Sequence, residues 1–201
     1  GTVRITYGSY MVRDYRTGEL IEGPLPTETP PLDLHTELLW VSLPEDHLQT
    51  TINTLDAPLL EPTDRAGDDP RVPMEQARYT YAGRLHAAEH GIIQLAPLEL
   101  MIDNHDIGGL STPAHPDERI PGPVWFVHDG IDGGIGFARA IYNNFEDIAE
   151  RTYEHLEACE CQRRRGCPLC IMSEHCGNQN DPLYRVVGYQ ILSDVIDQLQ
   201  R

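Results

Sequence analysis

Five cysteines near the end of the sequence are the residues best suited to chemistry. All of them fall within eighteen positions, as Cys159, Cys161, Cys167, Cys170 and Cys176. An odd number of crowded cysteines is not typical of a disulfide framework, which spreads paired cysteines along a secreted chain. Closely spaced thiolates are ligands that Zn²⁺ prefers in tetrahedral sites. The spacing therefore predicts one structural Zn²⁺ ion, because four protein ligands leave no open position for catalysis.

Five cysteines compete for the four positions around such an ion. Our preferred ligand set is Cys161, Cys167, Cys170 and Cys176, in which Cys167 and Cys170 form a two-ligand turn. In the alternative set, Cys159 is the fourth ligand in place of Cys176. Reduced thiols without a metal, a redox pair and an iron–sulfur cluster are the competing interpretations.

A run of three arginines lies inside the cysteine stretch. Arg163, Arg164 and Arg165 form a local positive spot on an acidic chain. Because arginine is a common phosphate contact in protein–DNA complexes, these residues are our candidates for contacting DNA. A solvated loop without a DNA partner is the alternative.

A second pattern with metal-binding chemistry lies in the middle of the chain. His86, Glu89 and His90 match the H-x-x-E-H pattern of inverted zinc peptidases. On a helix the two histidines share one face and could chelate Zn²⁺ beside the glutamate. The sequence names no third ligand. A zinc metallopeptidase is therefore an alternative function, and a structural role for these side chains is the simpler interpretation.

Two further polar segments are weighed as binding sites. The glycine-rich residues 129–136 precede an expected helix, where backbone N–H groups can bind a phosphate. Asp129 and Asp132 would repel a phosphate, so we favour a tight turn that packs the helix on a sheet. The second segment, Asp103, His105 and Asp106, fits either a metal site or an ordinary loop of satisfied carboxylates.

The charge balance excludes several functions. The chain has 201 residues, a formal net charge of −17 and no lysine, so all 15 basic residues are arginine. A Walker A loop and Schiff-base catalysis both need a lysine, and this chain by itself therefore cannot be an ATP-driven motor. We expect a halophilic source, where high salt screens acidic surfaces. A surface that repels polyanions is the alternative.

Two kinds of periodicity outline the secondary structure. The expected strands are residues 2–7, 10–15, 38–43 and 124–127, with a turn at 17–18 and an extended proline-rich segment at 24–31. The expected helices are residues 75–101, in which Pro97 kinks the helix or ends its first segment, a second helix from residue 137, and residues 184–199. The inner face of the second helix is expected to carry Ile141, Phe145, Ile148, Thr152 and Leu156. Residues 54–73, rich in Asp and Pro, are expected to form an exposed loop.

These elements predict an α+β fold with a mixed sheet, three main helices and a small cysteine–zinc subdomain. We expect a single domain with an accessory core at residues 1–158, a four-cysteine zinc loop at 159–182 and a C-terminal helix at 183–201 that packs on the core. No stretch approaches the roughly 20 apolar residues that span a bilayer. The start lacks both a methionine and a signal-peptide pattern. We therefore expect a fragment of a larger cytoplasmic protein.

The cysteine stretch resembles the MrfA-like zinc-binding domain, which closes the chain of a family of superfamily-two DNA helicases. The resemblance rests on Cys161, the Gly-Cys-Pro-Leu-Cys segment 166–170 and the Cys-Gly-Asn-Gln-Asn-Asp-Pro-Leu segment 176–183. Other blocks agree in order, at residues 36–40, 88–90, 95–98, 106–111 and 128–137. His128 is a mild departure from the family pattern, and the resemblance runs across nearly the whole chain.

The resemblance implies a C-terminal accessory region attached to two RecA-like motor domains and a winged-helix-like module. Helicases of this MrfA/Hrq type use ATP and Mg²⁺ in their motor domains, translocate 3′ to 5′ on single-stranded DNA and act in DNA repair. The implied partners are motor domains of the same full-length chain and DNA, expected to be single-stranded, with no membrane. The implied cofactor of this chain is structural Zn²⁺. A protein-interaction module that does not touch DNA is a further alternative.

Overall fold

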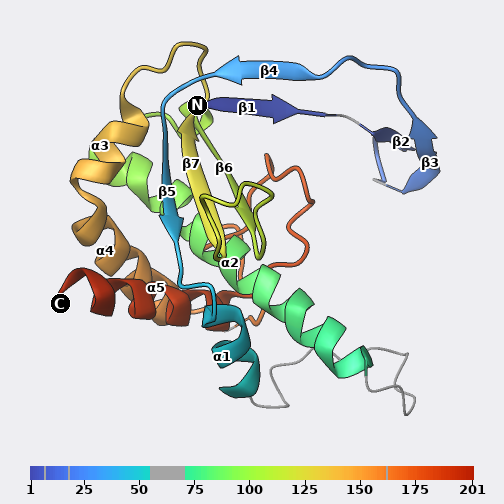
Figure 1. Ribbon diagram of the computed structural model, residues 1–201. Helices are drawn as coiled ribbons and strands as arrows, with labels where there is room; N and C mark the ends of the chain where they lie inside the picture. The colour runs from blue at the N-terminus through green and yellow to red at the C-terminus, as the bar shows by residue number, and fades with distance from the viewer. Residues whose placement is uncertain (7, 18, 55–70, 162) are drawn as a thin grey trace.

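The long helix α2 is the element on which much of the chain packs. In the computed structural model, α2 runs from Arg71 to Leu100 through the middle of the molecule and contacts helices α4 (Phe145–Ala158) and α5 (Arg185–Leu199) (Figure 1). It also contacts strands β6 (Ile107–Thr112) and β7 (Val124–Asp129). The structure describes residues 1–6, 8–17, 19–54, 71–161 and 163–201, and the side chains of 51–54 and 71–77 are left aside. The loop expected over 54–73 therefore lies mostly outside the described residues.

Within the described residues, the strands form three separate antiparallel sheets. Two of them are pairs, β1 (Thr2–Ile5) with β4 (Leu32–His35) and β2 (Ser9–Arg13) with β3 (Leu20–Pro26). The third has three strands, in which β5 (Leu38–Ser42), β7 and β6 follow in the order β5-β7-β6. The first two sheets form an arm that extends away from the helices (Figure 1). The predicted α+β class is confirmed. The expected single mixed sheet is wrong, because the strands form three separate antiparallel sheets.

The N-terminal hairpin has a local cause. Asp14 accepts hydrogen bonds from the backbone N–H groups of Arg16 and Thr17, each at 2.8 Å, and its own N–H donates to the carbonyl oxygen of Glu19. Aspartate commonly fixes turns in this way. The expected turn at residues 17–18 is therefore organised by Asp14, and Gly18 lies outside the described residues.

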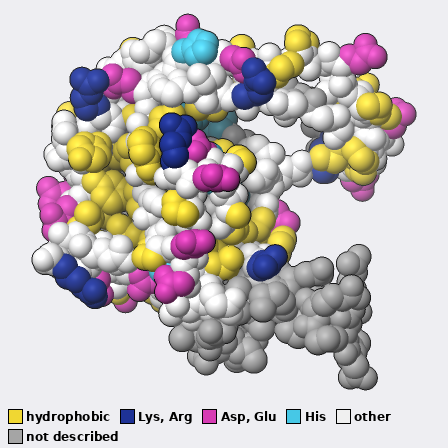
Figure 2. Space-filling model, viewed as in Figure 1, with side chains coloured by type: hydrophobic (Ala, Val, Ile, Leu, Met, Phe, Trp, Pro, Cys, Tyr) yellow, Lys and Arg dark blue, Asp and Glu magenta, His cyan; other side chains and the backbone are white. Residues whose placement is uncertain are grey.

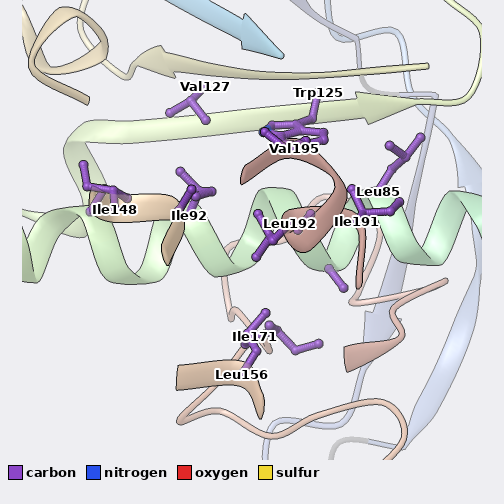
Figure 3. Packing of buried hydrophobic residues seen from close by; sticks show 14 of the residues in the cluster. Leu85, Ile92, Trp125, Val127, Ile148, Leu156, Ile171, Ile191, Leu192 and Val195 are labelled. Carbon is purple, nitrogen blue, oxygen red and sulfur yellow. The ribbon is translucent and has the colours of Figure 1, made fainter. Parts of the chain in front are cut away.

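The hydrophobic core lies where α2 meets the three-stranded sheet, α4 and α5. Figure 3 shows Trp125 and Val127 of β7 on one side of Ile92, and Ile191 and Leu192 of α5 packed against the same helix. All five side chains are fully buried. Each buried aliphatic side chain contributes roughly 1.5–3 kcal/mol by leaving water, so this cluster fixes how the sheet and helices sit around α2.

Two expected helices differ from the observed ones. The helix expected from residue 137 is two helices, α3 (Phe137–Asn143) and α4, because Asn144 leaves helical geometry and its side chain donates to the carbonyl oxygen of Ala140 at 2.8 Å. Pro97 lies inside α2, which ends at Leu100 just before the left-handed residue Met101. A short helix α1 (His47–Thr54), the one-turn helix η2 (Asn104–Asp106) and strand β6 were not expected.

The outer face of β5 and α3 carries exposed apolar side chains. Trp40 is 54% exposed and Tyr142 is 70% exposed. They line an open groove of about 450 Å³ together with Gly1 and other residues of β5 and α3. Figure 2 shows hydrophobic side chains gathered on this side of the molecule. No helix within the described residues is long and apolar enough to cross a bilayer.

Candidate metal centre

Four sulfur atoms meet after the end of α4. The thiols of Cys159, Cys161, Cys167 and Cys170 all lie within 4.8 Å of one another. The sulfur atoms of Cys159 and Cys167 are 3.9 Å apart. A tetrahedral Zn²⁺ ion with Zn–S bonds of about 2.3 Å separates its sulfurs by about 3.8 Å, so the arrangement fits zinc with little movement.

The local backbone explains why these thiols converge. Helix α4 ends at Ala158, and Cys159 leaves the helix as its C-cap. Gly166 has a φ of 79°, and an added side chain there would lie 2.4 Å from Ile171 and 3.0 Å from the sulfur of Cys170. The carbonyl oxygen of Cys167 then accepts hydrogen bonds from the N–H groups of residues 170–172. A tight turn results that only glycine can precede.

Backbone N–H groups point at two of the sulfurs. The N–H of Cys167 donates to the sulfur of Cys170 at 3.0 Å, and the N–H of Arg163 donates to that of Cys161 at 3.5 Å. Burial raises the pKa of the Cys170 thiol. Burial also raises the pKa of Cys161. Hydrogen bonds from the N–H of Arg163 and with the neighbouring thiols lower this pKa by a larger amount, so the net shift is downward. A buried thiolate such as Cys170 needs a nearby cation, and Zn²⁺ would supply one.

Two side chains hold the cysteine loop against α4. Arg185, only 3% exposed, donates to the carbonyl oxygens of Leu156 and Arg163, the second at 3.3 Å. His155 contacts the carbonyl oxygen of Leu169 through Nε2 at 2.8 Å. The sequence analysis did not identify Arg185, because its partners are backbone carbonyl groups that leave no pattern in the sequence.

The structure divides the five cysteines differently from our preferred set. Cys176 does not join the other sulfurs and lies instead beside His86 and His90 on α2. Cys159 takes the fourth corner of the sulfur group. The geometry therefore favours the alternative ligand set. Which four thiols bind the ion stays a prediction.

The two histidines of the H-x-x-E-H pattern do face one side, as a helix predicts. Nδ1 of His86 lies 2.6 Å from the carbonyl oxygen of Pro182, and Nδ1 of His90 lies 2.6 Å from that of Ile171. Nε2 of His86 is 3.4 Å from the sulfur of Cys176. Although burial raises the pKa of Cys176, hydrogen bonding with the His90 side chain and with backbone N–H groups lowers it overall.

Glu89 points toward the sheet rather than into that group. A side chain added at Gly109 of β6 would lie 2.6 Å from Oε1 of Glu89, so the glycine lets strand and carboxyl group approach. Burial raises the pKa of Glu89 to about 7, while a hydrogen bond with Ser111 and the charge of His86 act in the opposite direction. Glu89 does not belong to the group formed by the two histidines and Cys176.

The three candidate arginines surround the start of α5. The guanidinium of Arg164 lies 5.2 Å from the ring centre of Tyr184, and Arg165 forms an ion pair with Asp181. Arg163 and Arg165 are exposed, and Arg164 is half-buried. Two of the three cations therefore have partners within the chain, and Arg163 is the cleanest probe of DNA contact.

The glycine-rich turn already contains its own anion. The carboxylate of Asp129, fully buried, accepts hydrogen bonds from the N–H groups of residues 135–138 at the start of α3. The second aspartate, Asp132, accepts one from the N–H of His35 at 3.1 Å. The favoured interpretation, a tight turn that packs a helix on a sheet, agrees with these contacts, since the protein's carboxylate occupies the position that a phosphate would take.

The cluster Asp103, His105 and Asp106 is an exposed turn. Asp103 caps η2 by accepting from the N–H of His105 at 2.9 Å, and this hydrogen bond lowers the pKa of its carboxyl group. His105 also stacks edge-on against His175, with ring centres 4.6 Å apart. Within the described residues this cluster forms no metal-ligand group.

Known proteins share both the core and the cysteine loop. Residues 88–171 match the family described as the MrfA Zn-binding domain. An uncharacterized protein of Methanocaldococcus jannaschii is 37% identical over 113 residues, which cover 56% of this chain and 99% of that protein. The chain belongs to the MrfA Zn-binding domain family. The matched range includes four of the five cysteines and the buried part of α2 from Ala88 onward.

Two longer relatives of this MrfA Zn-binding domain are helicases by name. ATP-dependent helicase hrq1 of Schizosaccharomyces pombe is 28% identical over 100 residues, and the ATP-dependent helicase YprA of Bacillus subtilis is 27% identical over 152 residues. These two matches span 46% and 76% of this chain, but only 9% and 16% of the two helicases. The activity of those whole proteins is therefore not shown for this chain.

A solved structure shares the fold. The DUF1998 helicase MrfA, in a crystal structure with DNA, matches with a TM-score of 0.54 and 22% identity over 98% of this chain and 21% of that chain. At this identity the match shows the fold alone. It nevertheless extends the likeness beyond residues 88–171 to nearly the whole chain, including the N-terminal sheets.

Proposed function

We propose that this chain is the zinc-stabilised C-terminal accessory region of an ATP-dependent DNA helicase of the MrfA/Hrq type. The observation that carries the proposal is the match of 98% of this chain to about a fifth of a helicase that was crystallised with DNA. Two relatives that bear the name helicase point the same way.

The motor would lie elsewhere in the same full-length protein. This chain has no lysine, so the phosphate-binding lysine of a P-loop and the ATP and Mg²⁺ that it binds belong to other domains. On the family resemblance, those motor domains translocate 3′ to 5′ on single-stranded DNA and act in DNA repair. A cysteine cluster that binds metal fits a reducing cytoplasm. The part that falls to this chain is to brace the motor, guide the strand, or both.

The zinc loop is the element best placed for that role. It joins the end of α4 to the start of α5, and Arg185 ties both ends together through the carbonyl oxygens of Leu156 and Arg163. Arg163, Arg164 and Arg165 lie in this loop, and the side chains of Arg163 and Arg165 are exposed. A zinc-fixed loop would hold these cations in one orientation relative to the strand, and phosphate contacts of this kind position a protein on DNA.

The experiment compares variants of the full-length parent protein. We expect Cys170→Ser to lower unwinding of a tailed duplex at least about tenfold while ATP hydrolysis without DNA is retained, because the fault lies outside the motor. Unchanged unwinding by Cys170→Ser, or by a protein that lacks this region, would instead support a protein-interaction module without a role on DNA.

A second comparison isolates DNA contact. Arg163→Gln should weaken binding to single-stranded DNA and reduce the slope of log affinity against log salt by about 0.7, the value for one phosphate contact. The matched control is Arg119→Gln, which changes another exposed arginine, one that pairs with Asp117 in the segment between β6 and β7. Equal effects of the two variants would contradict a specific contact at Arg163.

A further inference from the structure

His86, His90 and Cys176 form a second ligand group that is separate from the four-cysteine cluster. Their ligand atoms lie within 4.8 Å of one another, and the sulfur of Cys176 is 3.4 Å from Nε2 of His86. A tetrahedral Zn²⁺ ion with Zn–S of about 2.3 Å and Zn–N of about 2.05 Å separates sulfur and nitrogen by about 3.6 Å. The distance between the sulfur of Cys176 and Nε2 of His86 is therefore close to that expected around a bound zinc ion.

Backbone carbonyl groups fix the tautomer of both histidines. A carbonyl oxygen only accepts hydrogen bonds, so Nδ1 of His86 donates to Pro182 and Nδ1 of His90 donates to Ile171, each at 2.6 Å. In the neutral rings, Nε2 then carries the lone pair on the side of Cys176. Histidines that bind zinc typically donate their other N–H to a carbonyl or carboxylate oxygen in this way.

Proton counting favours a cation between the three residues. The two rings offer two lone pairs, and a neutral thiol offers one S–H proton. One buried imidazole nitrogen would then lack a donor, which folded proteins avoid. Both rings are buried, His86 at 6% and His90 at 5% exposed, so water gives little help. A divalent ion accepts the lone pairs of both rings and of the thiolate at once.

The loop after Cys176 is shaped around its sulfur. The N–H of Asn180 donates to the sulfur at 3.3 Å, and both Gln179 and Asn180 are left-handed, with φ of 55° and 59°. The side chain of Asn180 holds Ser173 with two hydrogen bonds of 2.8 Å, through the N–H and the carbonyl oxygen. Left-handed geometry is unfavourable for non-glycine residues, and here it directs the N–H of Asn180 toward the thiol.

We propose that Nε2 of His86, Nε2 of His90 and the sulfur of Cys176 bind a second Zn²⁺ ion. Within the described residues no fourth His, Cys, Asp or Glu belongs to this group. The fourth position is therefore open to water or a small ligand, the ligand count of catalytic rather than structural zinc sites. The ion joins α2 to the loop 171–182 and is independent of the helicase assignment.

The test counts zinc in the full chain, purified without chelator, by inductively coupled plasma mass spectrometry. We expect two zinc ions per wild-type chain and one in His90→Asn or Cys176→Ser. Asparagine places its amide N–H near the position of Nδ1, so His90→Asn keeps a donor for Ile171 while it removes Nε2. The matched control His105→Asn changes an exposed histidine outside both groups and should retain two ions.

A diffraction measurement covers the case in which a variant fails to fold. Wild-type crystals measured above and below the zinc absorption edge should show two anomalous peaks, one within bonding distance of Cys176, His86 and His90. A single peak at the four cysteines, or one zinc ion per wild-type chain that Cys176→Ser leaves unchanged, would overturn the proposal. An ion other than zinc at Cys176 would overturn the choice of metal.

Discussion

The sulfur atoms of Cys159 and Cys167 lie 3.9 Å apart, although one belongs to the end of a helix and the other to a separate turn. Cys159 arrives as the C-cap of α4, while Cys167 begins the turn that Gly166 permits. A metal ion between them would therefore fasten the helix end to the loop and, through Arg185, to the start of α5. This relationship makes the zinc loop part of the fold and not an appendage.

Loss of one buried thiol should release the zinc of the four-cysteine cluster. Cys170→Ser removes a ligand at the centre of the cluster, and structural zinc contributes on the order of 10 kcal/mol to folding in small zinc domains. We expect zinc content to fall by one ion, and amide hydrogen exchange to speed up across residues 159–182 and the first turns of α5. The control is Leu169→Ser, an 81% exposed neighbour in the same turn, which should keep both the metal and the protection.

Replacing the buried arginine should loosen the same loop without touching a sulfur. Arg185→Lys places all its donors on one nitrogen, so it cannot reproduce the fork by which Nε and Nη1 of the guanidinium reach two separate carbonyl oxygens. We expect a loss of about 2 kcal/mol in the free energy of unfolding, with faster zinc transfer to a chelator. Denaturant unfolding and chelator kinetics measure the two effects. Arg151→Lys, an exposed arginine of α4 paired with Glu99, should change neither.

The carboxylate of Asp129 should be the dominant stabilising group of the glycine-rich turn. Asp129→Asn removes the negative charge that accepts hydrogen bonds from the N–H groups at the start of α3. The amide nitrogen of asparagine is itself a donor, so at least one of these N–H groups would lose its acceptor. We expect a loss of about 3 kcal/mol in the free energy of unfolding. Asp132 accepts one exposed hydrogen bond, from the N–H of His35, so Asp132→Asn should lower the free energy of unfolding by less than about 1 kcal/mol. Equal losses in the two variants would disprove the assigned role.

The sequence was most informative where contacts are local. The tight spacing of the cysteines predicted a sulfur cluster, and apolar residues at helical spacing predicted α2, α4 and α5. Ile141, Ile148, Thr152 and Leu156 are buried as that spacing indicates. The choice between Cys159 and Cys176 depended on where the loop after Ile171 crosses α2, and spacing within the chain carries no information about that crossing.

Burial on all sides explains why the polar residues of α2 were difficult to interpret. Residues 83–92 are buried around the full circumference of the helix, so its polar side chains need partners from elements far away in sequence. Arg84, for example, donates to the carbonyl oxygen of Val187 at 3.2 Å. For the same reason the sequence did not identify Cys176 as the third member of the histidine group, because Cys176 lies about 90 residues after His86.

Salt should stabilise this chain. The formal net charge of −17 repels itself at low ionic strength, and the Debye length falls from about 10 Å at roughly 0.1 M salt to about 3 Å at roughly 1 M. We expect Tm to rise by about 5 °C over this range, which corresponds to roughly 2 kcal/mol for a chain of this size. Differential scanning calorimetry in sodium chloride and in potassium chloride measures the shift. A constant or falling Tm in both salts would contradict the expected adaptation to a halophilic source.

The measurement that tests the central claim most directly is anomalous diffraction at the zinc edge, which locates the ion among the sulfurs. The four-cysteine geometry predicts a peak about 2.3 Å from the sulfur atoms of Cys159, Cys161, Cys167 and Cys170. An ion that takes Cys176 in place of Cys159, or a disulfide among these residues with no peak between them, would contradict it.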